Sequence, residues 1–187
     1  MTIEEIFNQI SYHMIEGLMI HSQLTDYFGF LGFEGYQQCH LYHYFEESSN
    51  YKKLGNYLLK HCNRLLAEDR IANPNIIPTD WVQYYRQQVT NTVRKTALQS
   101  GIEKWVNWEK ETKKLYEKFY NELIAGTEVG AAKELAKYIK DVDYELAEAE
   151  QELLKLQSID FSITDVMLEQ KDIKKEYSKK LKEIKLC

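Results

Sequence analysis

The chain has 187 residues, a formal net charge of −5, and only 2 prolines and 8 glycines. A length of this order fits one domain, and the scarcity of helix breakers favours long helices. The acidic balance argues against binding driven by nucleic-acid phosphates, which needs a basic surface. No long apolar run and no signal-peptide pattern occurs, so we expect a cytoplasmic protein without a membrane partner.

Two helices are predicted in the first third of the chain. Thr2 is a suitable N-cap for a helix over about residues 3–30, because apolar residues recur there at helical spacing. A second helix with its own apolar stripe follows over about residues 36–66. The turn between them is marked by a cluster of three glycines: Gly29, Gly32 and Gly35.

The longest loop is predicted next, around Pro74 and Pro78. Helical spacing returns at Thr79 and continues to about Ala125, and the helix could kink or break at Ser100-Gly101. Compared with the family named below, the chain is longer here. We expect the extra segment, residues 79–100, to extend the third helix or to add a short helix before it.

A fourth helix is predicted to end near Gln157, and a tail helix over about residues 164–185 could be capped by Thr164 or Asp165. Short, long and short connections suit a four-helix bundle with one crossover. The predicted fold class is therefore all-α. It is one domain over residues 1–187, with a bundle over about 3–157, one long crossover connection and a short C-terminal fifth helix.

The predicted inward faces of the bundle carry side chains that are typical of metal ligands. Di-iron carboxylate bundles use glutamates and Glu-x-x-His pairs that project inward, and iron accepts both carboxylate and imidazole. On spacing alone, solvated charged helix faces explain the same pattern. The candidates, helix by helix, are His13 and Glu16, then His43, Glu47 and Asn50, then Glu109, and finally Asp141 and Glu145.

Several segments together resemble the ferritin family of di-iron carboxylate bundles. "LGFEGYQQCHLYHYFEESSNYKKL", residues 31–54, is similar to the turn and second-helix start of bacterial ferritins. "FNQI", residues 7–10, resembles the first-helix start of that family. Residues 107–123 and 136–156 are similar to its third and fourth helices. The resemblance implies a ferritin-like bundle, iron (Fe²⁺/Fe³⁺) as the bound metal, and a homo-oligomeric cage, a 24-mer because the tail helix is present.

The resemblance assigns metal ligands residue by residue. It places the bridging glutamate at Glu47 and the third-helix glutamate at Glu109, the two catalytic candidates. The fourth-helix glutamate falls on Asp141, and two glutamates of a third iron site fall on Glu46 and Glu145. Three positions depart from the family: Asn50 replaces a histidine, Val142 a glutamine, and Met14 the first-helix glutamate, although His13 and Glu16 are close by.

These departures predict a degenerate ferroxidase centre, with iron chemistry that is weakened or moved toward Glu46 and Glu145. The function implied is iron storage and detoxification, in which Fe(II) is oxidised by dioxygen or peroxide and kept as a ferric mineral. One alternative is a DNA-protecting mini-ferritin (12-mer), whose second-helix pattern "HLYHYFEE" resembles. Another is a non-catalytic bundle used for interaction. We expect His40 and His61 to be half-buried or at the surface, and His21 to line the core through hydrogen bonds.

Overall fold

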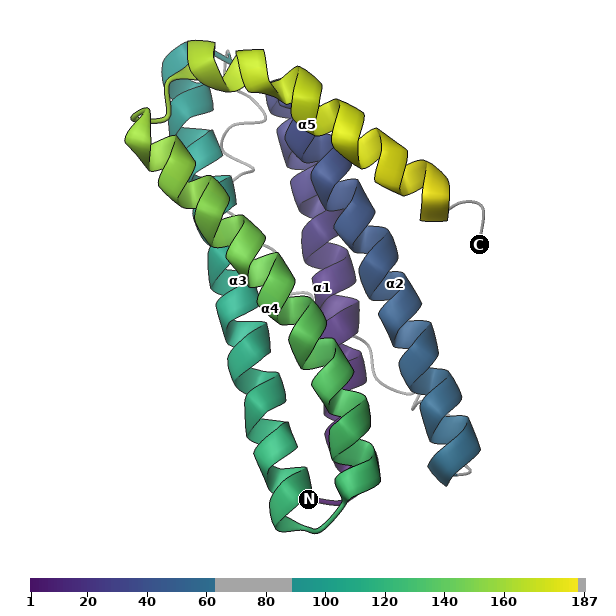
Figure 1. The fold of residues 1–187 in the computed structure, drawn as a ribbon. Coiled ribbons are helices and arrows are strands. Elements are labelled where there is room, and N and C mark those ends of the chain that lie inside the picture. Colours follow the sequence, from purple (N-terminus) through teal and green to yellow (C-terminus); the bar gives the residue numbers. More distant parts are fainter. Residues whose placement is uncertain (63–88, 185–187) are drawn as a thin grey trace.

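In the computed structural model, the described residues are 1–62 and 89–184, and they are helical almost throughout (Figure 1). The expected proline loop, the helix start at Thr79 and Cys187 lie outside these residues. No strand occurs within the described ranges. The helices are α1 (Ile3–Leu31), α2 (Glu34–Cys62), α3 (Asn91–Ala125), α4 (Val129–Ser158) and α5 (Ile163–Ile184).

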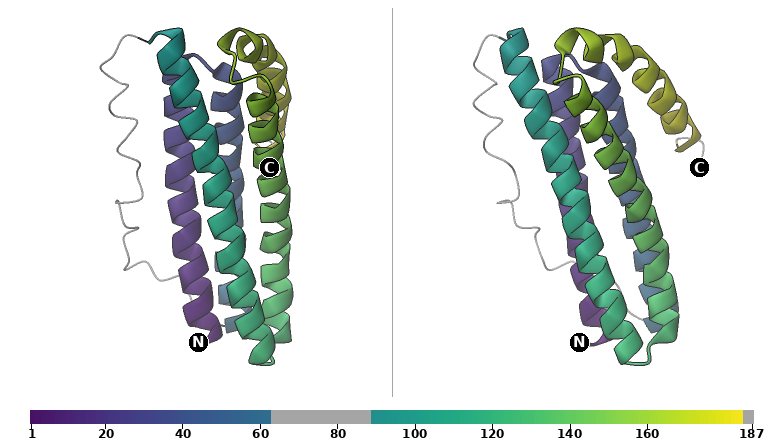
Figure 2. Two further views of the ribbon diagram at one scale, coloured as in Figure 1. Left: turned by 90° about the vertical axis from the view of Figure 1, so that its left-hand side faces the viewer. Right: turned by 60° about the vertical axis from the view of Figure 1, so that its left-hand side comes forward.

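The four long helices form a bundle with the predicted connectivity. α1 and α2 are antiparallel, as are α3 and α4 (Figure 1). α2 and α3 run in the same direction, so the end of α2 and the start of α3 lie at opposite ends of the bundle (Figure 2). The predicted fold class, a four-helix bundle with one long crossover and a C-terminal fifth helix, is confirmed.

Local sequence explains where α1 begins and ends. Thr2 accepts a hydrogen bond from the backbone N–H of Glu5, whose carboxylate accepts one from the N–H of Thr2 in return. This reciprocal capping box satisfies amide groups that the first helical turn leaves free. The helix ends at Gly32, whose φ of 84° is accessible to glycine at little cost. The other two glycines of the expected turn, Gly29 and Gly35, are helical.

α3 continues through Ser100 and Gly101, so the helix does not break at the position where a kink or a break was considered. Gly101 is buried, and a Cβ atom at this position would lie 2.7 Å from Cζ of Phe28. The glycine therefore serves close packing of α3 against α1. The helical turns of Asn91 to Ser100 also show that part of the longer segment extends the third helix, one of the two outcomes expected for it.

α5 begins at Ile163, one residue before the predicted N-cap at Thr164 or Asp165. Thr164 and Asp165 lie inside its first turn, and the N–H of Val166 bonds to the carbonyl of Ser162. α5 packs mainly on α2, and the sequence did not predict this contact. Oε1 of Gln170 accepts hydrogen bonds from the first backbone N–H groups of α2, at 2.8 and 3.2 Å. α5 thus supplies the N-terminal cap that α2 lacks in its own sequence.

Two separate apolar clusters make up the core of the bundle. One surrounds Phe28 and Trp105 near the α1–α2 turn, and the other surrounds Phe7 and Tyr116 near the α3–α4 turn. On α2 and α3, the buried polar residues of the bundle fall between the stretches that contribute to these clusters, and on α4 the half-buried Glu145 does so. The bundle therefore holds a polar layer at mid-height. Within the described ranges, no helix is long and apolar enough to cross a bilayer.

Candidate metal centre

The polar layer contains carboxylates and imidazoles with almost no solvent exposure. None of the buried side chains in the described residues is a lysine or an arginine, so no such cation compensates the buried carboxylates. Buried charge without compensation is costly, which makes a bound cation the natural complement of this layer. Its members are His21 (0% exposed), His40 (0%), His43 (2%), Glu47 (6%) and Glu109 (1%), together with Glu145, whose side chain is 12% exposed.

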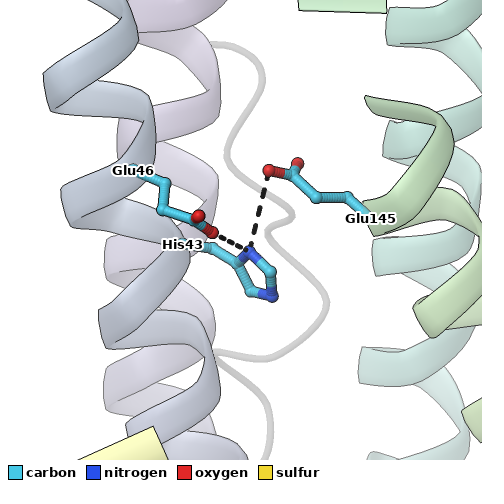
Figure 3. Close-up of side chains that lie close together, drawn as sticks. All are labelled: His43, Glu46 and Glu145. Carbon is cyan, nitrogen blue, oxygen red and sulfur yellow. Dashed lines mark ion pairs between the residues drawn. The ribbon is translucent and has the colours of Figure 1, made fainter. Parts of the chain in front are cut away.

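Two of these groups, His43 of α2 and Glu145 of α4, lie close enough to the half-buried Glu46 of α2 to share one metal ion with it (Figure 3). Nδ1 of His43 is 3.2 Å from Oε2 of Glu46 and 3.9 Å from Oε1 of Glu145. One ligand atom from each residue lies within 4.8 Å of the others. Neither nitrogen of the His43 ring makes a hydrogen bond, which is rare for a buried polar atom.

The other edge of the His43 ring faces a second carboxylate. Nε2 of His43 is 3.6 Å from Oε2 of Glu148 on α4. Two tyrosines fix the flanking carboxylates, since Tyr177 of α5 donates its hydroxyl to Glu148 and Tyr42 donates to Glu46 at 2.6 Å. The fifth helix is therefore part of the wall of this site.

Burial controls the ionisation of the carboxylates. It raises the pKa of Glu145 to about 7, against the opposing effect of the His43 imidazole. Burial also raises the pKa of Glu47 and of Glu109 well above the ordinary range, and the charge of Glu145 adds to both shifts. Without a cation, these groups hold protons more readily than ordinary glutamates do.

The pKa of His43 is shifted in the opposite direction from the pKa values of the other two buried histidines, His21 and His40. Burial alone disfavours its imidazolium, but Cys39 and the carboxylates of Glu148 and Glu46 raise the pKa of His43 well above its usual value. Burial lowers the pKa of His21 and His40, and repulsion from neighbouring imidazoles lowers it further. The carboxylates therefore act on His43 as a cluster arranged to hold positive charge.

Glu47 and Glu109, the two residues expected to form the catalytic pair, both lie in the buried layer. Glu109 accepts a hydrogen bond from Nε1 of Trp105 at 3.1 Å. The residue of α1 that faces Glu47 is Gly17, where an added Cβ would lie 3.1 Å from Oε1 of Glu47. α1 therefore places a glycine, and no carboxylate, beside Glu47. Met14, the position of the expected first-helix glutamate, lies in the apolar cluster around Phe7 and Tyr116.

The first-helix candidates His13 and Glu16 form a group of their own. Nδ1 of His13 is 3.6 Å from Glu16, and its ring stacks on Trp108 at 4.2 Å. Nε2 of His13 is 2.7 Å from the Thr112 hydroxyl, which itself donates to the Trp108 carbonyl. The hydroxyl proton is thus engaged, so Nε2 of His13 must be the donor. These residues do not join the three-ligand cluster around His43.

Asp141 and Asn50 lie at the edge of the site instead of in its centre. Both line a cavity of about 880 Å³ between α2, α4 and α5, which extends to His43, Glu46 and Glu145. Asn50 accepts a hydrogen bond from Nζ of Lys53 at 3.0 Å. Burial and the charge of Glu46 raise the pKa of Asp141, while Lys53 lowers it. The cavity gives the three-ligand cluster a route to solvent.

The burial of the histidines differs in part from what the sequence predicted. His40 was expected at or near the surface, and this was wrong: its ring is fully buried and stacks on Phe28 at 5.2 Å. His21 lines the core and meets His40 by a hydrogen bond, as expected. His61 is exposed, also as expected. His43 was paired with Glu47 by spacing, but its nearer carboxylate is Glu46, and the i, i+3 pattern His-x-x-Glu was the available signal.

The donor set fits a borderline divalent cation or iron. Imidazole nitrogen suits iron, zinc and copper, while carboxylate oxygen suits harder ions, and iron accepts both. The unpaired nitrogens of His43 point the same way, because a metal ion would satisfy one of them. The residues present therefore match what an iron site requires, although His43 is absent from the ligand set that the ferritin resemblance implies.

Comparisons with known proteins agree on the fold. No protein-family model matches the chain, and no curated protein does. Among solved structures, an open-pore ferritin from the hyperthermophilic archaeon Archaeoglobus fulgidus superposes with a TM-score of 0.75 at 14% identity, covering 92% of this chain and 94% of that one. An engineered closed form of the Archaeoglobus fulgidus ferritin gives the same values, and a humanised archaeal ferritin gives a TM-score of 0.72 at 14% identity with the same coverage. The chain has the ferritin-like fold.

Proposed function

We propose that the protein binds iron and acts in iron storage and detoxification, oxidising Fe(II) with dioxygen or peroxide and holding the ferric product in a homo-oligomeric cage. The observation that carries the proposal is the cluster of His43, Glu46 and Glu145, whose ligand atoms converge at the wall of the cavity between α2, α4 and α5. The ferritin-like fold supports it, because di-iron carboxylate proteins with this fold build their metal sites from side chains that project into the bundle core.

The charges of the cluster fit the reaction. Two ionised carboxylates and a neutral imidazole balance one ferrous ion, and Glu148 lies 3.6 Å from the other ring edge, where it can offset the additional charge of the ferric product. Each ferrous ion gives up one electron, so two of them reduce one dioxygen, which takes up two protons and becomes hydrogen peroxide. The adjoining cavity, with Asp141 and Glu183 in its lining, offers further carboxylates to the ferric ion as it leaves.

Size-exclusion chromatography followed by aerobic Fe(II) loading tests this function. A 24-mer of the 22.2 kDa chain would have a mass of about 530 kDa and should take up many irons per chain. A 12-mer of about 270 kDa that protects DNA from peroxide would favour the mini-ferritin alternative. A small oligomer without iron uptake would favour a non-catalytic bundle, the reading that the departures at Asn50 and Val142 support.

A double variant locates the chemistry. Glu46→Gln combined with Glu145→Gln keeps side-chain volume but removes both charges of the cluster, so Fe(II) oxidation followed by ferric absorbance should slow at least tenfold. The matched control replaces two exposed glutamates, Glu111 and Glu128, with glutamine and should oxidise Fe(II) at the wild-type rate. An unchanged rate in the cluster variant would refute the assignment of these residues.

A further inference from the structure

The two nitrogens of the His43 ring have different surroundings. Glu46 and Glu145, the other members of the three-ligand cluster, both lie on the Nδ1 side, at 3.2 and 3.9 Å (Figure 3). Ligand atoms bound about 2.1 Å from one ion lie about 3–3.4 Å apart, so Nδ1 and the two carboxylates can share an ion after small shifts. Nε2 lies on the far edge of the ring, away from this cluster. The ring therefore has one edge for a metal ion and a second edge that is free for another contact.

Glu148 of α4 faces the second edge. Its Oε2 lies 3.6 Å from Nε2 of His43, slightly too far for a hydrogen bond, and Nε2 makes no hydrogen bond within the described residues. When an ion occupies Nδ1, the ring proton must sit on Nε2, and the ion makes this N–H a stronger donor. A shift of about 0.5 Å then closes the bond to Glu148. Cys39 is also near the ring, but a thiol is a weaker partner than a carboxylate.

Tyr177 of α5 fixes the carboxylate of Glu148. Its hydroxyl donates to Oε1, so the other oxygen, Oε2, stays turned toward His43. The Tyr177 ring is itself held by two contacts. Its centroid lies 5.7 Å from that of Tyr42, and Nζ of Lys180 lies 4.1 Å from it, where a cation is attracted to the ring face. An ordered path therefore runs from Nε2 of His43 through Glu148 to the fifth helix.

α5 also connects the two helices that carry the ligands. α2 and α4 make few direct contacts, whereas α5 packs along α2 and reaches α4 through Tyr177 and through the ion pair of Lys155 with Glu169. The spacing between the ligands on α2 and on α4 thus depends on how α5 docks. A metal-binding histidine generally donates its remote N–H to a carboxylate, carbonyl or water that fixes the ring and strengthens metal binding. Glu148 and Tyr177 have the position and the chemistry for this task.

We propose that Glu148 and Tyr177 are positioning residues of the metal centre: His43 binds the ion through Nδ1 and donates its Nε2 proton to Glu148, which the Tyr177 hydroxyl holds in place. This inference rests on the proposed function, because the ion is the one placed at His43, Glu46 and Glu145. Glu148 acts through His43 and is not a ligand of the same ion, because the ring separates its carboxylate from Nδ1. The fifth helix thereby takes part in metal binding.

Cobalt titration of the metal-free protein, in its native assembly, measures the effect on affinity. Tyr177→Phe removes only a hydroxyl, and Glu148→Gln replaces the charged acceptor by a neutral one of similar size. Both variants should keep the stoichiometry and the visible spectrum of wild-type Co²⁺ binding, but bind about tenfold to a hundredfold more weakly. The matched control is Tyr138→Phe, because Tyr138 donates to Glu134, at 3.4 Å, outside the cluster. It should match the wild type, and equal affinity in all four proteins overturns the inference.

Pulsed electron paramagnetic resonance with a substoichiometric amount of Cu²⁺ separates positioning from a general loss of stability. Copper accepts imidazole, and the quadrupole coupling of the remote ring nitrogen depends on the hydrogen bond that its N–H makes. This coupling should change in Tyr177→Phe and in Glu148→Gln, and should keep its wild-type value in Tyr138→Phe. Lower stability alone would not move it. If one of the two variants does not fold, the other suffices. An unchanged coupling overturns the inference and leaves the metal position of the proposed function in place.

Other outcomes bear on the proposed function itself. A wild type that binds no Co²⁺ tightly, or a copper–imidazole signal that persists in His43→Gln, overturns the metal position at the His43 cluster. If Glu148→Gln abolishes Co²⁺ binding and Glu145→Gln does not, the ion lies at Nε2, and the assignment of the two ring edges is overturned.

Discussion

Glu145 carries a charge that the bundle tolerates poorly in the absence of metal. Its pKa rises from an ordinary 4.5 to about 7 because the side chain is buried. The folded protein therefore binds this proton more tightly than the unfolded chain does. The resulting stability is fully present below pH 4.5 and is lost as the pH rises through 7.

Glu145→Gln should remove this pH-dependent loss. In metal-free protein, we expect the variant to gain up to about 3 kcal/mol over the wild type between pH 4.5 and pH 8. Urea unfolding at a series of pH values, with a chelator present, measures the difference. Glu111→Gln, at an exposed glutamate, should show no such trend. A stability difference that stays constant with pH would mean that Glu145 is not the group responsible.

At the residue scale, the sequence predicted the buried carboxylates better than the histidines. Glu47 and Glu109 fall on the apolar faces of strongly periodic helices, so their burial followed from register. His40 and His21 lie on helix faces in the same way, but a single histidine carries no signal that separates a surface residue from a buried one. Only the contact between them, across 19 positions of sequence, reveals their role.

At the scale of elements, the structural role of a glycine was the property hardest to predict from the sequence. A glycine inside a helical pattern indicates a break or a close approach, and the sequence alone does not distinguish the two. Gly101 and Gly35 are both close approaches: the first lets α1 pack on α3, and the second lets α5 pack on α2. The ends of α1, in contrast, were predicted within a residue, because the Thr2 cap and Gly32 are local signals.

Gly35→Ala should weaken the docking of α5. The new Cβ atom would lie 2.8 Å from the backbone carbonyl oxygen of Gln170 and 2.9 Å from Cβ of Ile173, and backbone does not yield easily. We expect a loss of about 1–3 kcal/mol in unfolding free energy, as for other overpacked sites. Trypsin cleavage within α5, at Lys174 for example, should become faster.

Gly130→Ala is the matched control for that variant. Gly130 is also a helical glycine, in the first turn of α4, but a Cβ atom there would meet nothing within 4 Å. Alanine should therefore stabilise the protein by up to about 1 kcal/mol through helix propensity. If both variants behave alike, the contact between α2 and α5 does not restrict residue 35.

At the scale of the whole molecule, the polar layer divides one bundle core into two apolar halves. Long helices with regular apolar stripes predict the bundle, and the connection lengths predict its connectivity. The position of the layer follows from the points where buried polar residues interrupt those stripes on α2 and α3. The sequence could not predict that α5 packs beside this layer. The turn that precedes α5 contains Asp160 and Phe161, both at positive φ, and it sets the direction of the helix that brings the Tyr177 hydroxyl to Glu148.

The layer makes the stability of the whole bundle depend on metal. A ligand that binds only the folded state stabilises it by about 2.7 kcal/mol at a free concentration of one hundred times Kd. For a domain of this size, that corresponds to a rise in Tm of about 5–10 °C per site. Differential scanning calorimetry with saturating Co²⁺ and with a chelator should show this rise, at one fixed protein concentration, since subunit association also stabilises the fold.

The double variant Glu46→Gln and Glu145→Gln decides where that stabilisation arises. It should be more stable than the wild type in chelator, since the buried charge of Glu145 is gone, and should gain little from Co²⁺ at the His43 cluster. Mg²⁺ should raise the Tm of the wild type far less than Co²⁺, because it prefers an all-oxygen octahedral shell and loses water reluctantly. An equal rise with Co²⁺ in the wild type and the variant would place the ion on the acidic surface instead of within the bundle.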